Sequence, residues 1–159
     1  MSEKVEKLYN TLRAKYKQLP DFKKLDSDFE LTSIEDKHIN ERYFLRAVRR
    51  RIYEKVYYFN GALVTVIAPQ SPNILLAHEN KFISNDERDE VMEVVRKLTR
   101  VERDHLLLEV DYDEAEDADF IKISFDVWQD VKPTIKKLFI TMRDSWDKRD
   151  NLKVGDYFG

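Results

Sequence analysis

The sequence predicts a mainly α-helical fold, a bundle of about four to five helices with a possible short β-hairpin element in the C-terminal third. Three observations lead to this prediction. The chain of 159 residues suits one packed core, because 42% of its residues are hydrophobic. It contains only 3 Gly and 4 Pro, so turn-forming residues are scarce. Apolar residues also recur every three or four positions over several long stretches, which is the spacing of a buried helix face.

The first helix is expected at the N-terminus, where Ser2 can cap its start and Pro20 ends it. Its buried face carries a regular series of apolar residues: Val5, Leu8, Tyr9, Leu12 and Tyr16. Residues 19–33 follow as a connector whose apolar side chains are expected to turn inward, namely Phe22, Leu25, Phe29 and Leu31.

The second helix is expected to be the long one, and Ser33 and Asp36 before it have the spacing of a capping pair. Its stripe consists of Phe44, Val48, Ile52, Val56 and Phe59. Asn60-Gly61 is either a helix stop or the tip of a hairpin, and the continuous stripe favours a helix that stops there. Residues 62–73 are a helical continuation or a strand, closed by Pro69 and Pro72.

The third helix is predicted to begin near Ser84, because Ser84 and Glu87 form a capping box. Asp86 and Asp89 add negative charge, which favours the positive start of a helix. The expected buried face is Val91, Val94, Val95, Leu98 and Val101.

The C-terminal third is ambiguous between helix and strand. Residues 105–113 alternate between apolar and polar positions as a strand does, and residues 120–128 fit a strand or a helix. We expect a helix over 117–130 and another over 133–147, with Pro133 breaking or starting a helix, and an irregular tail. Residues 1–108 would form the helical domain, and 109–159 an acidic loop and a helical, partly β, extension of the same fold.

The composition excludes several classes of function. The absence of Cys excludes disulfides, thiolate zinc sites and a cysteine nucleophile. The charged N-terminus and the absence of a long apolar run predict a soluble, cytoplasmic protein without membrane partners. The net charge of −3 gives no global signal for nucleic-acid binding. The charged fraction of 37% and the lack of Cys fit a heat-adapted protein.

No phosphate-binding glycine motif and no nucleophile elbow is present, so a non-enzymatic protein without a cofactor is expected. The sequence Glu102-x-x-His105 is half of the motif that carboxylate-bridged di-iron bundles use twice, but no second copy exists. His38-x-x-Glu41 has the reverse order, and His78 has no such partner. A carboxylate–histidine metalloprotein is therefore the third hypothesis.

An arginine-rich and aromatic stretch, RYFLRAVRRRIYEKVYYF at 42–59, is the strongest candidate binding site. Arginine and tyrosine are enriched at protein interfaces, and they also contact phosphates and stack on bases. We expect a protein interface or intramolecular ion pairs, with nucleic-acid binding as the alternative. The predicted partner-binding residues are Arg46, Arg49, Arg50, Tyr53 and Tyr57.

An acidic segment at residues 109–119 is the second candidate. It begins like a calcium loop but lacks the required Gly and the distal Glu. It is either a solvated loop that caps the next helix or a docking surface for a basic partner. The arginine helix of this chain could itself be that target, within the chain or across an oligomer. The docking residues are predicted to be Asp111, Asp113, Glu114, Glu116 and Asp117.

Three stretches of the sequence resemble the helical domain of GINS subunits, from the archaeal and eukaryotic replicative helicase assembly. QLPDFKKL (18–25) resembles the connector after the first helix, and 39–59 is similar to the long helix. Residues 82–107 resemble the helix opened by Ser/Thr-x-Glu-Glu. The resemblance implies a structural subunit of a hetero- or homo-oligomer, which bridges helicase and partner proteins through helix–helix interfaces. It also implies a small β domain after the helices, for which residues 105–130 are the candidate, and an archaeal source.

Overall fold

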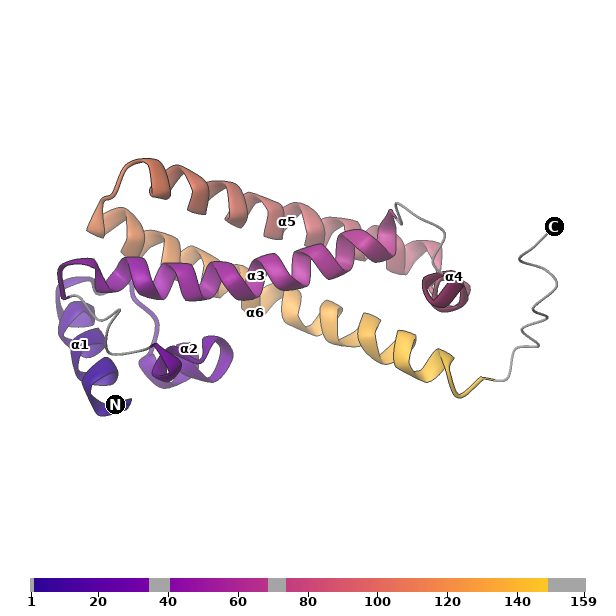
Figure 1. The fold of residues 1–159 in the computed structure, drawn as a ribbon, viewed down its shortest axis with the longest axis horizontal. Helices are drawn as coiled ribbons and strands as arrows, with labels where there is room; N and C mark the ends of the chain where they lie inside the picture. Colours follow the sequence, from indigo (N-terminus) through magenta and orange to yellow (C-terminus); the bar gives the residue numbers. More distant parts are fainter. Residues whose placement is uncertain (1, 35–40, 69–73, 149–159) are drawn as a thin grey trace.

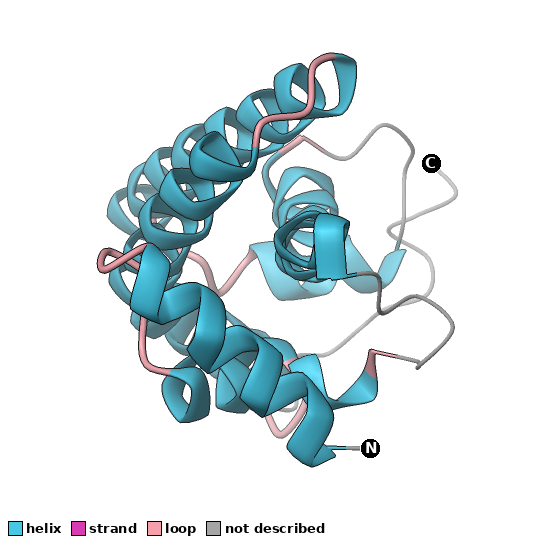
Figure 2. Cartoon of the chain, turned by 90° about the vertical axis from the view of Figure 1, so that its left-hand side faces the viewer, coloured by secondary structure: helices cyan, strands magenta, loops and turns pink. Residues whose placement is uncertain are grey.

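The computed structural model describes residues 2–34, 41–68 and 74–148, which form helices and connecting turns and no strand. Three long helices run side by side: α3 (Phe44–Ile67), α5 (Asn85–Val110) and α6 (Glu114–Ser145). Two shorter helices, α1 (Ser2–Lys15) and α2 (Phe22–Phe29), lie at one end of them, and α4 (Ile74–Asn80) lies at the other (Figure 1). Short 3₁₀ turns at Leu31–Ser33 and Glu41–Tyr43 lie between α2 and α3. The mainly helical fold is confirmed, as the view in Figure 2 shows.

The core lies between α3, α5 and α6, and the apolar stripes seen in the sequence build it. The stripe of α3 is buried at Phe44, Val48, Ile52, Val56 and Leu63, and that of α5 at Val91, Val94, Leu98 and Val101. From α6, the side chains of Ile121, Trp128, Val131, Ile135 and Leu138 enter the same cluster. Phe59, which is half-buried, packs between the rings of Trp128 and Phe139, with centroid distances of 5.4 Å and 6.2 Å. The removal of this apolar surface from water is the main favourable term for the fold.

The N-terminal pair of helices covers one end of this core. As expected, the apolar side chains of the connector are buried, but the connector itself contains α2, which Asp21 caps by accepting from the backbone of Lys23 and Lys24. Tyr9 donates from its hydroxyl to the carbonyl of Pro20 over 3.0 Å. Asp28 ties α2 to α6, because its carboxylate accepts from Gln129 over 2.6 Å and pairs with Lys132.

The capping box at the start of α5 is confirmed. The backbone N–H of Glu87 donates to the Ser84 hydroxyl over 3.2 Å, and the Glu87 carboxylate accepts from the Ser84 backbone N–H over 2.9 Å. The capping pair predicted at Ser33 and Asp36 is not part of α3, which begins at Phe44 without a side-chain cap, and Asp36 is outside the described residues.

Two predicted chain breaks are wrong. The α3 helix continues through Asn60-Gly61 to Ile67, so residues 62–67 are the helical continuation and not a strand. The α6 helix runs unbroken through Pro133, which is exposed on its surface. The side chains before and after this proline, Val131 and Ile135, remain buried, and their packing outweighs the backbone hydrogen bond that Pro133 cannot donate.

The possible β-hairpin element within residues 105–130 is not supported, because α5 extends to Val110 and α6 begins at Glu114. The helix expected over 117–130 is confirmed as part of α6. The buried face of α5 continues beyond Leu98 and Val101 through the polar residues Glu102 and His105. A hydrophobic pattern does not count such residues, so the helical period is hidden there and the alternation of Leu106, Leu108 and Val110 dominates the sequence. The predicted small β domain is absent from the described residues, and the tail beyond residue 148 is outside them.

Candidate functional site

The guanidinium of Arg49 is buried where α3, α5 and α6 meet. It donates from Nη1 to the backbone carbonyl of His105 over 3.0 Å and from Nη2 to that of Leu108 over 3.3 Å. Its Nη1 also lies 3.0 Å from Nδ1 of His105. On the α6 side, its Nε is 2.5 Å from Oδ1 of Asp117, and the two side chains are 0% exposed. We call Arg49, His105, Glu109 and Asp117 the arginine junction.

Glu109 collects three arginines of α3. Its carboxylate receives Nε and Nη2 of Arg50 at 3.0 Å and 2.7 Å, which is the bidentate geometry that favours this pair. Arg46 and Arg49 each bring an Nη2 atom to 2.9 Å from the same carboxylate. The hydrogen bonds from Arg50 hold the pKa of Glu109 far below its usual range, with help from Arg46 and Arg49. Glu109 therefore remains charged and fixes α5 against α3.

Two other members of the junction titrate abnormally. Burial raises the pKa of Asp117 to about 6, although the charge of Arg49 acts to lower it. Neither carboxylate oxygen of Asp117 has an aligned hydrogen-bond donor among the described residues. Burial and the nearby Arg49 charge lower the pKa of His105 to about 4, so its imidazole is neutral at pH 7. The ring of Tyr53 stacks on this imidazole with centroids 3.9 Å apart and planes at 6°.

The five predicted partner-binding residues differ in how much of each side chain is exposed and in how they pair within the fold. The side chain of Arg49 is not exposed, and the imidazole of His105 covers one face of the Tyr53 ring. Arg46 and Arg50 keep 28% and 54% of their side chains exposed but pair with Glu109. Of the five residues, Tyr57 is the freest, with 60% exposure. The intramolecular ion pairing that the sequence left open is therefore present in the fold.

The acidic segment is divided between structural roles. Asp113 caps α6 by accepting hydrogen bonds from the backbone of Ala115 and Glu116. This residue therefore fits the interpretation of the segment as a loop that caps the next helix. Glu114 binds Lys15 over 2.6 Å, and Asp117 is buried against Arg49. Asp111 and Glu116 are exposed, and their docking role stays a prediction.

The outer side of α3 carries exposed aromatic residues next to a groove. Tyr57 and Tyr58 are 60% and 70% exposed, and Val64 is 39% exposed. A groove of about 550 Å³ opens beside them, lined by Tyr57, Tyr58, Asn60, Gly61, Ala62, Val64, Thr65 and Glu102. A Cβ placed on Gly61 would meet no atom within 4 Å, so the backbone of α3 is open to solvent there. We call Tyr57, Tyr58, Gly61 and Val64 the tyrosine face.

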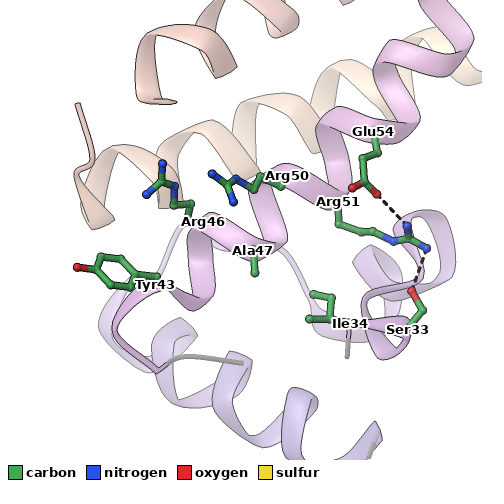
Figure 3. A pocket seen from close by; sticks show the side chains of 8 residues that line it. All are labelled: Ser33, Ile34, Tyr43, Arg46, Ala47, Arg50, Arg51 and Glu54. Carbon is green, nitrogen blue, oxygen red and sulfur yellow. Dashed lines mark hydrogen bonds and ion pairs between the residues drawn. The ribbon is translucent and has the colours of Figure 1, made fainter. Parts of the chain in front are cut away.

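A second hollow lies near the start of α3, between that helix and the turn at Leu31–Ser33 (Figure 3). Its volume is about 550 Å³, and its lining includes Arg46, Arg50 and Arg51. Arg51 donates to Glu54 and Ser33 at 2.9 Å each, the contacts drawn as dashed lines in Figure 3. All three arginines are thus engaged by acceptors of the chain itself, which leaves this hollow with little unpaired positive charge.

The sequence reasoning missed Tyr58, Gly61 and Val64 as a surface, and Glu109 as the acceptor of the arginines. Glu109 was visible in the acidic segment, and its spacing of four residues from His105 places both on one side of α5. The prediction of a helix stop at Asn60-Gly61 separates residues 62–67 from the helix face that carries Tyr57. The signal for a longer helix would have been an apolar face of α3 that continues past Asn60 at the same helical spacing.

Both residues of the half-motif Glu102-x-x-His105 are engaged by other side chains of the protein. Glu102 accepts from Nδ2 of Asn60 over 2.7 Å, and His105 belongs to the arginine junction. His78 packs on Trp146, and its Nε2 lies 3.1 Å from the carbonyl of Ser145. Among the described residues, no three histidine or carboxylate side chains converge as a metal site requires, and His38 is outside them.

The described helices include none that combines the length and the apolar character needed to cross a membrane. A scan against protein-family models found no match to the chain, and searches of curated proteins and of solved structures found none either.

Proposed function

We propose that the chain is a non-enzymatic assembly subunit that binds a helix of a partner protein through the tyrosine face of α3. One observation carries this proposal: Tyr57 and Tyr58, each more than half exposed, stand beside a groove that opens over Gly61. Tyrosine is over-represented among the residues that dominate binding energy at protein interfaces. The missing side chain at Gly61 lets a partner helix approach the backbone of α3 about one turn beyond these anchors.

The arginine junction supports this role indirectly. It joins α3 to α5 and α6 through Arg49, Glu109 and Asp117, and Arg49 lies about two turns before Tyr57 on the same helix. A surface that is held in its binding conformation loses less conformational entropy when a partner arrives. Arg50 and Tyr53 remain predicted contacts at the edge of the interface, where charge guides orientation and association rate.

The resemblance to GINS subunits suggests which assembly is involved. The three stretches that carry it span residues 18–25, 39–59 and 82–107, and they include the part of α3 that holds Tyr57 and Tyr58. We therefore propose a partner within a replicative helicase assembly. The mechanism is binding, in which aromatic anchors supply most of the affinity.

Nucleic-acid binding through the arginine helix is the alternative. It requires cations that can release counterions from phosphates. Because Arg46, Arg49 and Arg50 pair with Glu109, each phosphate contact would have to replace an internal ion pair. The arrangement therefore favours the protein interface over this alternative.

The test is a pull-down of the tagged full chain from a nuclease-treated lysate of its own organism, with quantitative mass spectrometry. We expect stoichiometric retention of replicative helicase proteins and at least a tenfold loss with Tyr57→Ala, Tyr58→Ala or Gly61→Leu. Ile140→Ala on α6, at a residue 39% exposed, is the matched control and should retain them. Retention that depends on nucleic acid, or that survives all three changes on α3, would overturn the proposal.

A further inference from the structure

A second groove, between α5 and α6, has an apolar floor with exposed apolar residues at its edges. Its volume is about 270 Å³. The floor is formed by Val101 and Phe120, which are buried, and by the half-buried Leu108. Leu107 of α5 and Ile123 of α6 line the same groove with 69% and 56% of their surface exposed. Large apolar side chains that remain in water beside a groove mark a surface whose burial by a ligand is energetically favourable.

The rim of this groove is acidic. Asp104, Glu116 and Asp119 line it, and none of the described residues that line it is Lys or Arg. No described cation pairs with Asp104 or Glu116, whereas most other acidic side chains of α5 and α6, such as Glu109, Asp117 and Asp130, have one. Asp119 accepts a hydrogen bond from the neutral amide of Gln18 over 2.8 Å, which leaves its charge uncompensated. Three negative charges therefore surround the apolar floor.

The floor also contains one polar group without a hydrogen-bond partner among the described residues, the hydroxyl of Ser124. Ser124 lines the groove, is 1% exposed, and its hydroxyl has no hydrogen-bond partner among the described residues. The hydroxyl oxygen has almost no surface in contact with solvent, so the favourable terms for a docked ligand come from the apolar floor and the charged rim. The groove thus combines an apolar floor, one unsatisfied hydroxyl and an uncompensated negative rim.

We propose that this groove is the docking site for a basic amphipathic helix of a partner protein. The residues that line it recur at spacings of three and four on both α5 and α6, so two helix surfaces form the walls. A third helix packs into such a groove through its own ridge of side chains. The walls extend over about two turns, or about 11 Å, so the ligand places apolar residues at i, i+3 or i+4, and i+7. Lysine or arginine beside these anchors meets Asp104, Glu116 and Asp119.

The groove between α5 and α6 shares no lining residue with the groove beside the tyrosine face. Glu102 faces the α3 side of α5, where it binds Asn60, and the groove residues Asp104 and Leu107 lie on the side toward α6. A subunit with both surfaces would hold two partner helices at once, one on each flank of α5. The two sites can therefore be tested and can fail separately.

The experiment uses the full chain and two synthetic helical peptides, each with leucines at i, i+4 and i+7. One peptide carries lysines beside the leucines, and the other carries glutamates at the same positions. Binding is measured by fluorescence anisotropy at two salt concentrations. We expect the lysine peptide to bind, to weaken as the salt concentration rises, and to bind at least tenfold more tightly than the glutamate peptide.

Variants locate the site. Ile123→Lys alters a side chain that is 56% exposed, and Asp104→Lys alters a half-buried carboxylate that has no ion-pair partner among the described residues. Each should weaken the lysine peptide at least tenfold while the circular dichroism spectrum stays unchanged. Tyr57→Ala is the control on the other surface and should leave peptide binding unchanged. Equal binding of the two peptides, or binding that survives both groove changes, would overturn the proposal. Self-association in sedimentation experiments that Ile123→Lys abolishes would assign the groove to a second copy instead, and would also overturn it.

Discussion

The Nε atom of Arg49 lies 2.5 Å from Oδ1 of Asp117, and neither side chain has any surface in contact with solvent. The pair joins the second turn of α3 to the first turn of α6. Two charges in such a place cost desolvation energy, which their attraction and the carbonyl contacts of Arg49 offset. The pair therefore makes the junction sensitive to the loss of either member.

Replacing Arg49 by Met should destabilise the fold by about 3–5 kcal/mol, because it leaves Asp117 and two carbonyl groups buried without their cation. Urea unfolding followed by circular dichroism measures this loss. The matched control is Arg50→Met, at a side chain 54% exposed, which should cost no more than about 1 kcal/mol. Equal losses in the two variants would show that the buried pair adds nothing to the stability. The double variant Arg49→Met/Asp117→Asn should lose less than the sum of the single changes.

Stability should depend on pH through two opposing groups of the junction. The pKa of Asp117 is raised from 3.8 to about 6, so the folded carboxyl keeps a proton that the unfolded chain releases. Its contribution to the free energy of unfolding therefore falls as the pH rises from about 4 to 6. The pKa of His105 is lowered from 6.5 to about 4, so its contribution rises with pH over nearly the same window.

Asp117→Asn removes only the first of these effects. We expect the free energy of unfolding of this variant to rise between pH 4 and pH 6 more steeply than that of the wild type, by on the order of 1 kcal/mol per pH unit. Urea unfolding at pH 4, 5 and 6 provides the two slopes. Asp111→Asn, at an exposed carboxyl, should follow the wild type. Parallel curves for the wild type and Asp117→Asn would contradict the raised pKa of Asp117.

Pro133 should be a site where one substitution stabilises α6. The residue is exposed inside a continuous helix, where it cannot donate a backbone hydrogen bond. Pro133→Ala should raise the free energy of unfolding by about 1–3 kcal/mol, because it restores that donor and a better helix former. Thermal and urea unfolding measure the gain. Lys136→Ala, at an exposed position in the next turn, should stay within about 0.5 kcal/mol of the wild type, and a similar result for Pro133→Ala would refute the prediction.

At Gly61, a small side chain should stabilise α3, whereas the large side chain of Gly61→Leu is the change expected to weaken partner binding. An alanine methyl at this position meets no atom within 4 Å, so Gly61→Ala should stabilise α3 by about 0.5–1 kcal/mol through its lower backbone entropy when unfolded. The reverse change at the neighbouring position, Ala62→Gly, should destabilise the helix by a similar amount. Unfolding measurements on both variants decide this. A loss of stability in Gly61→Ala would mean that the position is not open in solution.

The sequence by itself determined the helical class, the apolar faces of α1, α3 and α5, and the start of α5. These features depend on neighbours within one helix: the periodic stripe through Val48, Ile52 and Val56 and the capping box at Ser84 are complete in the local sequence. The proposal that Tyr57 contacts a partner also came from the sequence, because a tyrosine next to arginines has the composition of an interface, and it stays a prediction.

Only the tertiary structure decided which polar residues are buried. Asn60 and His105 continue apolar stripes because the residues that satisfy them, Glu102 and Arg49, come from another helix. Without those partners, burial would be unfavourable, so the local sequence favours a break at Asn60 and a strand near His105. For the same reason, neighbouring arginines of α3 differ in burial. Arg49 is buried against Asp117, whereas Arg50 pairs with Glu109 and keeps about half of its side chain exposed. The position of a carboxylate on a distant helix sets that difference, and no pattern within α3 contains it.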